Sequence, residues 1–311
     1  MGMRNHQKTR APRNRTLFVE SDEIPRLKRG LISASRLKSS HRNRIVLGDF
    51  ESALKGIADG AVDLLFLDPP YNLDKNFGGW TFKERSIDDY AHYLDEVISA
   101  LIPKLKPSAT VYICGDWKTS VSIPSIAGKH FRIRNRITWE REKGRGAQGN
   151  WKNCSEDIWF CTVSDRYTFH PDRVRLRRKV VAPYRDGSGA PKDWESGAEG
   201  SFRDTAPSNL WTDITIPFWS MPENTDHPTQ KSEKLLAKLI LASSEEGQLV
   251  LDPFLGSGTT AVVCRKLKRD FIGVERHPDY CLIAQKRLLQ ARPGDPIQGI
   301  AGGVFKERNS R

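Results

Sequence analysis

A short apolar segment that ends at two prolines is the strongest constraint on the fold of this chain. Five of the six residues from 62 to 67 are apolar, and Asp68-Pro69-Pro70-Tyr71 follows them. Such a segment is typical of a parallel strand buried on both faces. Proline cannot donate to a strand ladder, so the strand has to end here. Open α/β sheets bind ligands at the carboxyl ends of their strands, so Asp68, the Pro69 carbonyl and the Tyr71 ring are expected in a binding crevice.

Apolar strand-like segments alternate with helix-like ones along most of the remaining chain. We expect strands at residues 44–47, 109–114, 131–139, 157–163, 248–251 and 270–274. We expect helices at residues 50–57, 87–102, 235–242, 259–267 and 278–289. This alternation predicts an α/β fold, in which a doubly wound, mostly parallel sheet carries helices on both faces.

The charge of the chain is basic and unevenly distributed. The formal net charge is +12, and residues 1–44 carry 12 Lys and Arg against 3 Asp and Glu, while residues 132–185 carry 14 against 6. An excess of this size predicts a polyanionic partner, and nucleic acid before a membrane surface. A solvated basic surface is the alternative explanation for either stretch.

Cysteine usage and hydropathy indicate a soluble protein of the cytoplasm. The five cysteines have neither metal-ligand nor disulfide-like spacing, so we expect reduced thiols and no metal site. No apolar stretch approaches the length of a membrane span, and the basic start lacks the apolar stretch of a signal peptide. We therefore expect no membrane partner.

Three regions lack a clear helix or strand pattern. Residues 1–42 are polar and basic, and they predict a mobile tail with a short docked segment near 27–37. Residues 141–226 are interrupted by glycines, and they predict a loop-rich insertion with little regular structure beyond the strand at 157–163. Residues 292–311 are rich in Gly and Pro, and we expect this tail to fray.

A glycine-rich turn between a predicted strand and a predicted helix marks a second binding element. Gly256 and Gly258 flank Ser257, and Glu275 follows 19 residues after Gly256 at the end of the next strand. Glycine lets the backbone approach a ligand, and the amides of a helix N-terminus favour an anionic group. An acid at this distance often binds ribose hydroxyls. Alone, the pattern also fits a nicotinamide-dependent dehydrogenase or a simple tight turn, and no lysine follows Gly258 as in a Walker loop.

Three motifs occur in a characteristic order: residues 68–71, then 227–231, then 252–260. In this order the chain resembles the DNA amino-methyltransferases that use S-adenosylmethionine, in their permuted (beta) arrangement. The resemblance covers about residues 43–291 and implies a Rossmann-like methyltransferase fold. It implies a catalytic half at 43–140, a target-recognition region at 141–226 and a cofactor-binding half at 227–291, outside which lie the tails at 1–42 and 292–311.

The tetrapeptide fits this chemistry. An exocyclic amine of a base is a poor nucleophile, because its lone pair is delocalised into the ring. The Asp68 carboxylate and the Pro69 carbonyl can accept its two hydrogens and favour a pyramidal nitrogen, while Tyr71 stacks on a base flipped out of the duplex. Pro70 completes the catalytic set. Positioning and electrostatics then contribute most of the catalysis.

The resemblance also implies the cofactor site. Phe254 and the two glycines would hold the methionine end of the cofactor, Glu275 its ribose, and Thr229 or Lys231 would lie near its carboxylate. Asp49 is expected at the adenine, although a helix cap explains this residue equally well. The expected cofactor-binding residues are Asp49, His227, Thr229, Lys231, Asp252, Phe254, Gly256, Ser257, Gly258, Thr259 and Glu275.

The expected macromolecular partner is double-stranded DNA, and a homodimer is possible by the same resemblance. Salt-sensitive phosphate contacts are expected from Lys143, Arg145, Arg173, Arg175, Arg177, Arg178 and Lys179.

An acid at the first position of the tetrapeptide favours adenine N6 as the target, with cytosine N4 as the alternative. Two further hypotheses are an NAD-dependent oxidoreductase, which leaves residues 68–71 unexplained, and a DNA-binding protein without catalytic activity.

Overall fold

The computed structural model describes residues 11–77, 80–141, 149–181, 184–197 and 200–308. Two of the predicted phosphate contacts, Lys143 and Arg145, lie outside these ranges. Within the described ranges, no helix combines the length and the apolar character that crossing a membrane requires.

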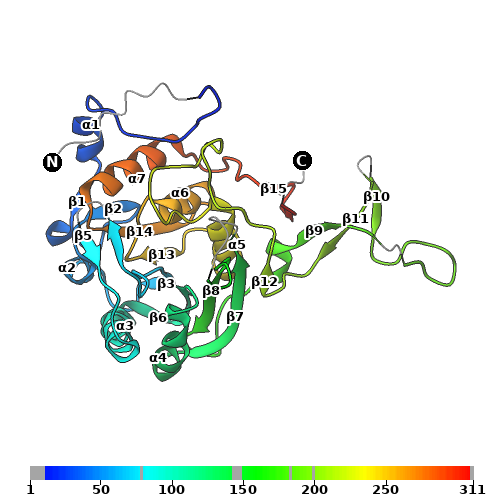
Figure 1. Cartoon of the computed structure of the whole chain (residues 1–311), viewed down its shortest axis with the longest axis horizontal. Helices are drawn as coiled ribbons and strands as arrows, with labels where there is room; N and C mark the ends of the chain where they lie inside the picture. Colours follow the sequence, from blue (N-terminus) through cyan, green and yellow to red (C-terminus); the bar gives the residue numbers. More distant parts are fainter. Residues whose placement is uncertain (1–10, 78–79, 142–148, 182–183, 198–199, 309–311) are drawn as a thin grey trace.

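A nine-stranded sheet forms the centre of the molecule (Figure 1), in the order β1-β2-β14-β13-β3-β6-β8-β7-β12. All neighbouring strands pair in parallel except β8, which is antiparallel to both β6 and β7. The mostly parallel sheet predicted from the sequence is therefore confirmed. The strands are β1 Ile32–Ser33, β2 Arg44–Leu47, β3 Val62–Leu67, β6 Leu105–Gly115, β7 Arg132–Glu140, β8 Ser155–Thr162, β12 Leu210–Trp211, β13 Leu249–Asp252 and β14 Asp270–Glu275.

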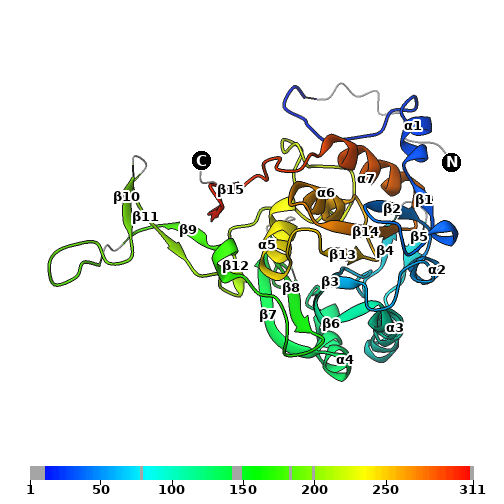
Figure 2. The same cartoon turned by 180° about the vertical axis from the view of Figure 1, so that it is seen from behind.

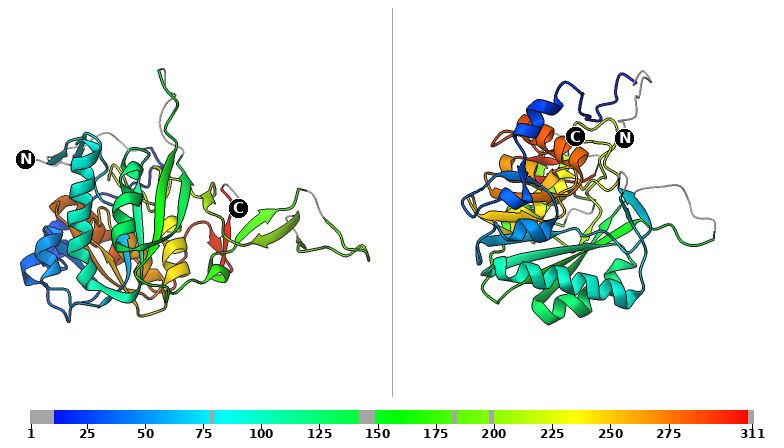
Figure 3. Two further views of the ribbon diagram at one scale, coloured as in Figure 1. Left: turned by 90° about the horizontal axis from the view of Figure 1, so that it is seen from below. Right: turned by 90° about the vertical axis from the view of Figure 1, so that its left-hand side faces the viewer.

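Helices cover both faces of this sheet, as expected for a doubly wound fold. Figure 3 shows α3 and α4 on one side of the strands and α6 and α7 on the other. The α-helices are α1 Ile24–Arg29, α2 Phe50–Leu54, α3 Ile87–Leu101, α4 Ile123–His130, α5 Glu233–Ser243, α6 Thr259–Lys266 and α7 Pro278–Gln290. Short 3₁₀ turns are η1 Ala34–Arg36, η2 Ile102–Lys104, η3 Thr119–Val121 and η4 Pro171–Val174.

The alternating side chains of β3 divide the apolar core into two clusters. Leu64 and Phe66 pack with α5, α6 and α7, whereas Leu65 and Leu67 pack with α2, α3 and α4. All six residues of β3 are buried. Because both faces of the strand are covered, its carboxyl end is fixed in position, and this end carries Asp68.

A second, five-stranded sheet projects from the body of the molecule (Figures 1 and 2). Its order is β10-β11-β9-β16-β15. Its strands are β9 Leu176–Lys179, β10 Glu195–Gly197, β11 Gly200–Thr205, β15 Ile300–Ala301 and β16 Val304–Lys306, and a separate hairpin joins β4 Lys75–Phe77 to β5 Trp80–Phe82.

The second sheet corrects two expectations from the sequence. The segment 141–226 is more regular than predicted, since it contributes β8 and β12 to the central sheet and β9, β10 and β11 to the second one. The tail is ordered rather than frayed at β15 and β16, because β16 pairs with β9 and Phe305 is fully buried beside Leu176. Gly302 and Gly303 form the turn with positive φ angles of 58° and 74°.

The tail predicted at residues 1–42 contains regular structure where it is described, from residue 11 on, and residues 1–10 lie outside the described ranges. Residues 24–36 form α1, β1 and η1, and β1 pairs in parallel with β2 at the edge of the central sheet. Leu27 is fully buried, and Leu17 forms a bridge with Thr225. The docked segment predicted near residues 27–37 therefore extends the central sheet by one short strand.

Candidate active site

A cavity of about 330 Å³ opens at the carboxyl ends of β2, β3, β13 and β14. It brings together motifs that lie far apart in the sequence. All four residues from Asp68 to Tyr71 line it, and so do all the predicted cofactor residues except Gly258. The cofactor residues at its wall are Asp49, His227, Thr229, Lys231, Asp252, Phe254, Gly256, Ser257, Thr259 and Glu275.

Two donors hold the side chain of Asp68. Lys231 Nζ donates to both carboxylate oxygens, at 2.7 and 2.9 Å, and the Tyr71 hydroxyl donates to Oδ1 at 3.0 Å. The sequence predicts Lys231 beside the cofactor's carboxylate, whereas in the structure its ammonium group lies on Asp68. Although burial opposes the charged form, Asp68 and Glu156 raise the pKa of Lys231 above its ordinary value, so the lysine stays protonated.

The hydroxyl group anchors the ring of Tyr71. It lies 3.1 Å from Glu156 Oε2 and accepts a hydrogen bond from Lys231 Nζ at 3.1 Å. Burial and the negative charges of Asp68 and Glu156 raise the pKa of Tyr71 well above its ordinary value, so the hydroxyl keeps its proton. The ring is half-buried at the cavity wall, which suits a fixed stacking surface.

Sequence reasoning missed Glu156 and its partner Arg141. Both carboxylate oxygens of Glu156 are engaged, since Arg141 Nη1 donates to Oε1 and the Tyr71 hydroxyl lies at Oε2. The predicted strand begins at residue 157, two residues after the start of β8, which leaves Glu156 outside it. An acid on the buried face of a half-buried strand is the signal that could have found it.

Glu275 connects the end of β14 to the glycine-rich loop. Its Oε2 accepts from the Gly256 amide at 2.9 Å, and its Oε1 accepts from the His277 amide at 2.6 Å. Gly256 has a φ of +55°, and a Cβ there would lie 3.0 Å from the ring of His227. Glycine is therefore needed at position 256. The two amide hydrogen bonds hold the Glu275 carboxylate at the cavity wall.

Asp252 stabilises the start of the glycine-rich loop through two hydrogen bonds. Its Oδ1 accepts from the Phe254 amide at 3.0 Å, and its Oδ2 accepts from the Thr260 hydroxyl at 2.5 Å. Burial raises the pKa of Asp252 to about 7, although both hydrogen bonds favour the charged form. The residue shapes the loop, so its contribution to the cavity is largely through backbone geometry.

Gly258 supports the loop without lining the cavity. It caps α6 with a φ of +84°, and a Cβ would lie 2.6 Å from the Cβ of Ala284 in α7. Its role in the structure is to let the two helices approach each other. The prediction of a cofactor contact at Gly258 is untested.

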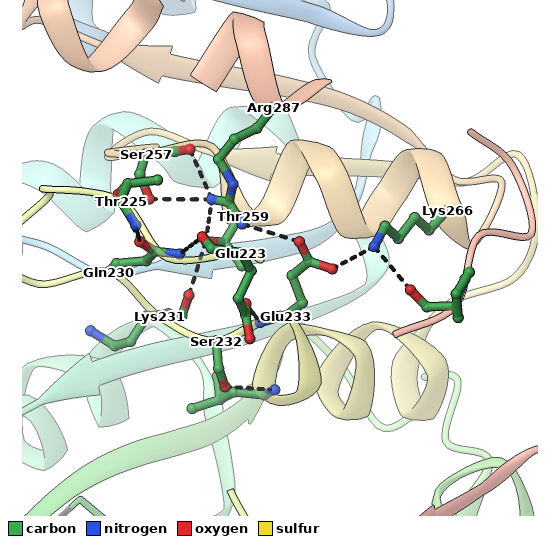
Figure 4. Close-up of polar contacts among 12 residues, drawn as sticks. Glu223, Thr225, Gln230, Lys231, Ser232, Glu233, Ser257, Thr259, Lys266 and Arg287 are labelled. Carbon is green, nitrogen blue, oxygen red and sulfur yellow. Dashed lines mark hydrogen bonds and ion pairs between the residues drawn. The ribbon is translucent and has the colours of Figure 1, made fainter. Parts of the chain in front are cut away.

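A buried polar network fixes the loop from behind (Figure 4). Arg287 donates to the Ser257 carbonyl and to the Thr259 hydroxyl, both at 2.9 Å, and it pairs with Glu233 at 3.2 Å. The Thr259 hydroxyl in turn donates to the Lys231 carbonyl at 2.9 Å. The network therefore joins the glycine-rich loop to the backbone of the residue that contacts Asp68.

Asp49 performs the capping role considered from the sequence. Its carboxylate accepts from the Ser52 amide at 2.8 Å and caps α2, while the residue also lines the cavity. Capping leaves the second carboxylate oxygen for other contacts. The contact with a cofactor's adenine stays a prediction.

His227 packs edge-on against Tyr280, with ring centroids 4.4 Å apart. Burial and the charge of Lys231 lower the pKa of His227 from 6.5 to about 3, so the folded protein keeps the ring neutral. Below pH 6.5 the unfolded chain binds a proton that the folded protein does not, so the free energy of unfolding falls with pH down to about 3.

We therefore expect the loss of stability between pH 7 and pH 5 to be smaller in His227→Gln than in the wild type, by about 1 to 2 kcal/mol. Urea unfolding at both pH values measures this difference. Equal losses in the two proteins would contradict a neutral, buried His227.

Three of the predicted phosphate contacts form ion pairs within the chain. Arg173 pairs with Glu245 on the loop after α5. The other two ion pairs join residues of the second sheet, or of the segment just before it, to acids nearby. These two pairs are Arg175 with Asp172 and Arg177 with Asp204. Arg178 and Lys179 complete β9. All five remain candidates for DNA contacts.

No cluster of three or more His, Cys, Asp or Glu side chains in the described part of the chain could hold a metal ion. The five cysteines are unpaired, and four of them are buried.

Comparisons with known proteins agree on one family. The sequence model of the N6/N4 DNA methylases matches residues 62–286. The type II methyltransferase M.HpaI of Haemophilus parainfluenzae is 33% identical over 250 residues, which cover 79% of this chain and 74% of the relative. The DNA adenine methyltransferase YhdJ of Escherichia coli (strain K12) is 34% identical over 253 residues, covering 78% and 82%.

Solved structures share the fold at lower identity. The M1.HpyAVI–SAM complex has a TM-score of 0.54 at 23% identity and covers 78% of this chain and 98% of its own. The cytosine-N4-specific PvuII DNA methyltransferase has a TM-score of 0.59 at 15% identity and covers 88% and 92%. The match of the family model over more than half of the chain, with the relatives at 33% and 34% identity, shows that the chain belongs to the N6/N4 DNA methylase family.

Proposed function

We propose that this DNA methyltransferase transfers a methyl group from S-adenosylmethionine to the exocyclic N6 of an adenine flipped out of double-stranded DNA. The observation that carries the proposal is the meeting of Asp68, Pro69 and Tyr71 with the glycine-rich loop around one cavity. The order of these motifs along the chain supports the permuted (beta) arrangement and the Asp-Pro-Pro-Tyr type of catalytic element.

The cavity wall fits the proposed cofactor. Gly256 leaves the space that a side chain would fill, and Glu275 presents a carboxylate suited to ribose hydroxyls. Phe254 and Gly258 are proposed at the methionine end of the cofactor, Thr229 or Lys231 near its carboxylate and Asp49 at its adenine. The other proposed cofactor residues are His227, Asp252, Ser257 and Thr259. When bound, the cofactor supplies an electrophilic methyl group. The protein's own contribution is to place the base against it.

Asp68 and Pro69 accept the hydrogens of the target amine and thereby favour a pyramidal, nucleophilic nitrogen. Tyr71 fixes the plane of the base, because its hydroxyl is already bound and its ring cannot turn freely. Lys231 keeps a positive charge beside Asp68, 2.7 Å from its carboxylate, and fixes the orientation of that carboxylate. Orientation and fixed charges are the main sources of rate enhancement in this scheme.

Adenine is favoured over cytosine by two observations. The tetrapeptide begins with Asp68, and the relative named a DNA adenine methyltransferase is 34% identical over 78% of the chain. A cytosine-N4-specific neighbour shares the fold at 15% identity, which carries no information on the base. Cytosine N4 is the second candidate.

The projecting sheet is the proposed target-recognition element. It lies within the proposed target-recognition region at 141–226, apart from β15 and β16, and it carries Arg178 and Lys179 on β9. We retain 43–140 as the catalytic half and 227–291 as the cofactor half. A homodimer is a further proposal that rests on the family resemblance alone.

We expect labelled S-adenosylmethionine to transfer its methyl group to unmethylated DNA of mixed sequence, and digestion to release N6-methyladenine. Chromatography of the nucleosides measures this product. N4-methylcytosine would overturn the base assignment. In a thermal melt, a rise in the midpoint with NAD and none with S-adenosylmethionine would favour the oxidoreductase hypothesis instead.

A further inference from the structure

Behind Asp68 lies a buried group of charged side chains that the proposed chemistry does not yet use. Glu156 on β8 is 3% exposed, and Arg141 follows β7. Arg141 donates to Glu156 Oε1, and Lys231 Nζ lies 3.4 Å from Glu156 Oε2. Although burial opposes the charged form, Lys231 and Arg141 hold the pKa of Glu156 below its ordinary value, so Glu156 is ionised at neutral pH.

Stability alone is a poor explanation for this group. Burying charges has a large desolvation cost, and well-packed apolar residues often stabilise a core equally well. Glu156 does not line the cavity and therefore cannot touch the base directly. It does touch both donors that hold Asp68, namely Lys231 and Tyr71. Its position points to a role through these two residues.

The Tyr71 hydroxyl has one proton and two carboxylates within reach. Asp68 Oδ1 lies at 3.0 Å and Glu156 Oε2 at 3.1 Å, while Lys231 Nζ donates to the hydroxyl oxygen from the third side. A phenol can donate only one hydrogen bond of full strength. The proton therefore has two alternative acceptors at nearly equal distance, and a small rotation of the O–H bond exchanges them.

This alternative frees Oδ1 of Asp68 when a base enters. Its Oδ1 already accepts from Tyr71 and Lys231, and its Oδ2 accepts from Lys231. A carboxylate oxygen has two lone pairs, so Oδ1 has none left while both donors are bound to it, whereas Oδ2 keeps one. An amino hydrogen can bind Oδ1 only after a donor leaves. A donor that left without another acceptor would be buried and unsatisfied, which is costly. Glu156 is the acceptor within reach of both donors.

We propose that Glu156 is a positioning residue, which takes over the Tyr71 hydroxyl and the Lys231 ammonium group when Asp68 accepts the amino group of the target base. Arg141 fixes the orientation of Glu156 from the opposite side. The inference rests on the proposed function, since it assigns a role in binding the amine. By this proposal Glu156 affects only the binding of the base, whereas the residues of the glycine-rich loop bind the cofactor.

The test compares Glu156→Gln with Asp157→Asn on the full-length protein. Glutamine keeps the shape and one acceptor oxygen but removes the charge that draws Lys231. Asp157, the next residue of β8, accepts from Thr138 on the neighbouring strand and serves as a matched control for the loss of one acidic charge. We expect kcat to fall about 10- to 100-fold in Glu156→Gln, with KM for S-adenosylmethionine within about twofold of wild type and Asp157→Asn unaffected.

Adding Tyr71→Phe distinguishes positioning from a general loss of structure. Without the hydroxyl, only the Lys231 part of the exchange remains, so Glu156→Gln should lower kcat less in the Tyr71→Phe background than in the wild type. Equal fold-losses in both backgrounds, or wild-type kcat in Glu156→Gln, would overturn the inference.

Two further outcomes are informative. If Glu156→Gln fails to fold, Glu156→Asp keeps the charge for Arg141 but shortens the reach to Tyr71, and full activity of this variant would refute the proposal. Absence of methyl transfer by the wild type would instead refute the proposed function itself.

Discussion

Asp68→Ala is expected to lower the rate of methyl transfer about a thousandfold or more while S-adenosylmethionine still binds. The variant loses the carboxylate that accepts an amine hydrogen, an interaction made at the reacting nitrogen itself. The cofactor residues of the glycine-rich loop are held by Arg287 and Glu275 and do not depend on Asp68. Single-turnover kinetics measure the rate, and calorimetric titration measures the binding of the cofactor.

Stability and chemistry have to be separated in this variant. Asp68→Ala leaves Lys231 buried beside Glu156 and without its closest partner, which costs about 3 to 5 kcal/mol. Replacing Lys231 with methionine in addition removes the buried charge that has lost its closest partner. We expect the double variant to regain most of the lost stability and none of the activity. Recovered activity, or full activity in Asp68→Ala alone, would refute the mechanism.

Gly258→Ala is expected to destabilise the fold by about 3 to 5 kcal/mol. Two effects combine, because alanine is strained at a φ of +84° and its Cβ would lie 2.6 Å from that of Ala284. Relief of the clash requires α6 and α7 to move apart, and with them the glycine-rich loop. Urea unfolding measures the stability, and the variant should also bind S-adenosylmethionine more weakly.

Gly247→Ala is the matched control for Gly258→Ala. Gly247 has a φ of +78°, and nothing lies within 4 Å of the position of a Cβ. Only the backbone strain remains, so the expected cost is about 1 kcal/mol. Similar costs at both positions would show that the contact between the two helices tolerates the extra methyl group.

Local patterns explain which parts of the site could be predicted. Asp68 and Glu275 follow apolar strands, and a strand end is visible in a short window of sequence. The contact between Gly256 and His227 joins two segments that are distant in the sequence, but each residue belongs to a recognisable motif. The central sheet followed for the same reason, since each strand and helix carries its own periodicity.

Long-range partners explain what could not be predicted. The ammonium group of Lys231 could have met a cofactor carboxylate or a protein carboxylate, and its partner Asp68 lies 163 residues away in the sequence. Glu156 and Arg141 meet because β7 and β8 pair in one particular register. The order of β15 and β16 depends on β9, a strand far away in the sequence, so their Gly-rich surroundings suggested a loose tail.

The pairing of β16 with β9 has a consequence for biosynthesis. The ribosome makes residues 176–179 long before it makes residues 304–306. Until β16 is made, one edge of β9 has no partner strand, although the strands of the central sheet are already available. Closing this gap is slow, because distant segments pay loop-closure entropy before they gain contacts. We therefore expect the five-stranded sheet to be completed after Asp68 is in place, so that the cavity forms before the projecting sheet is complete.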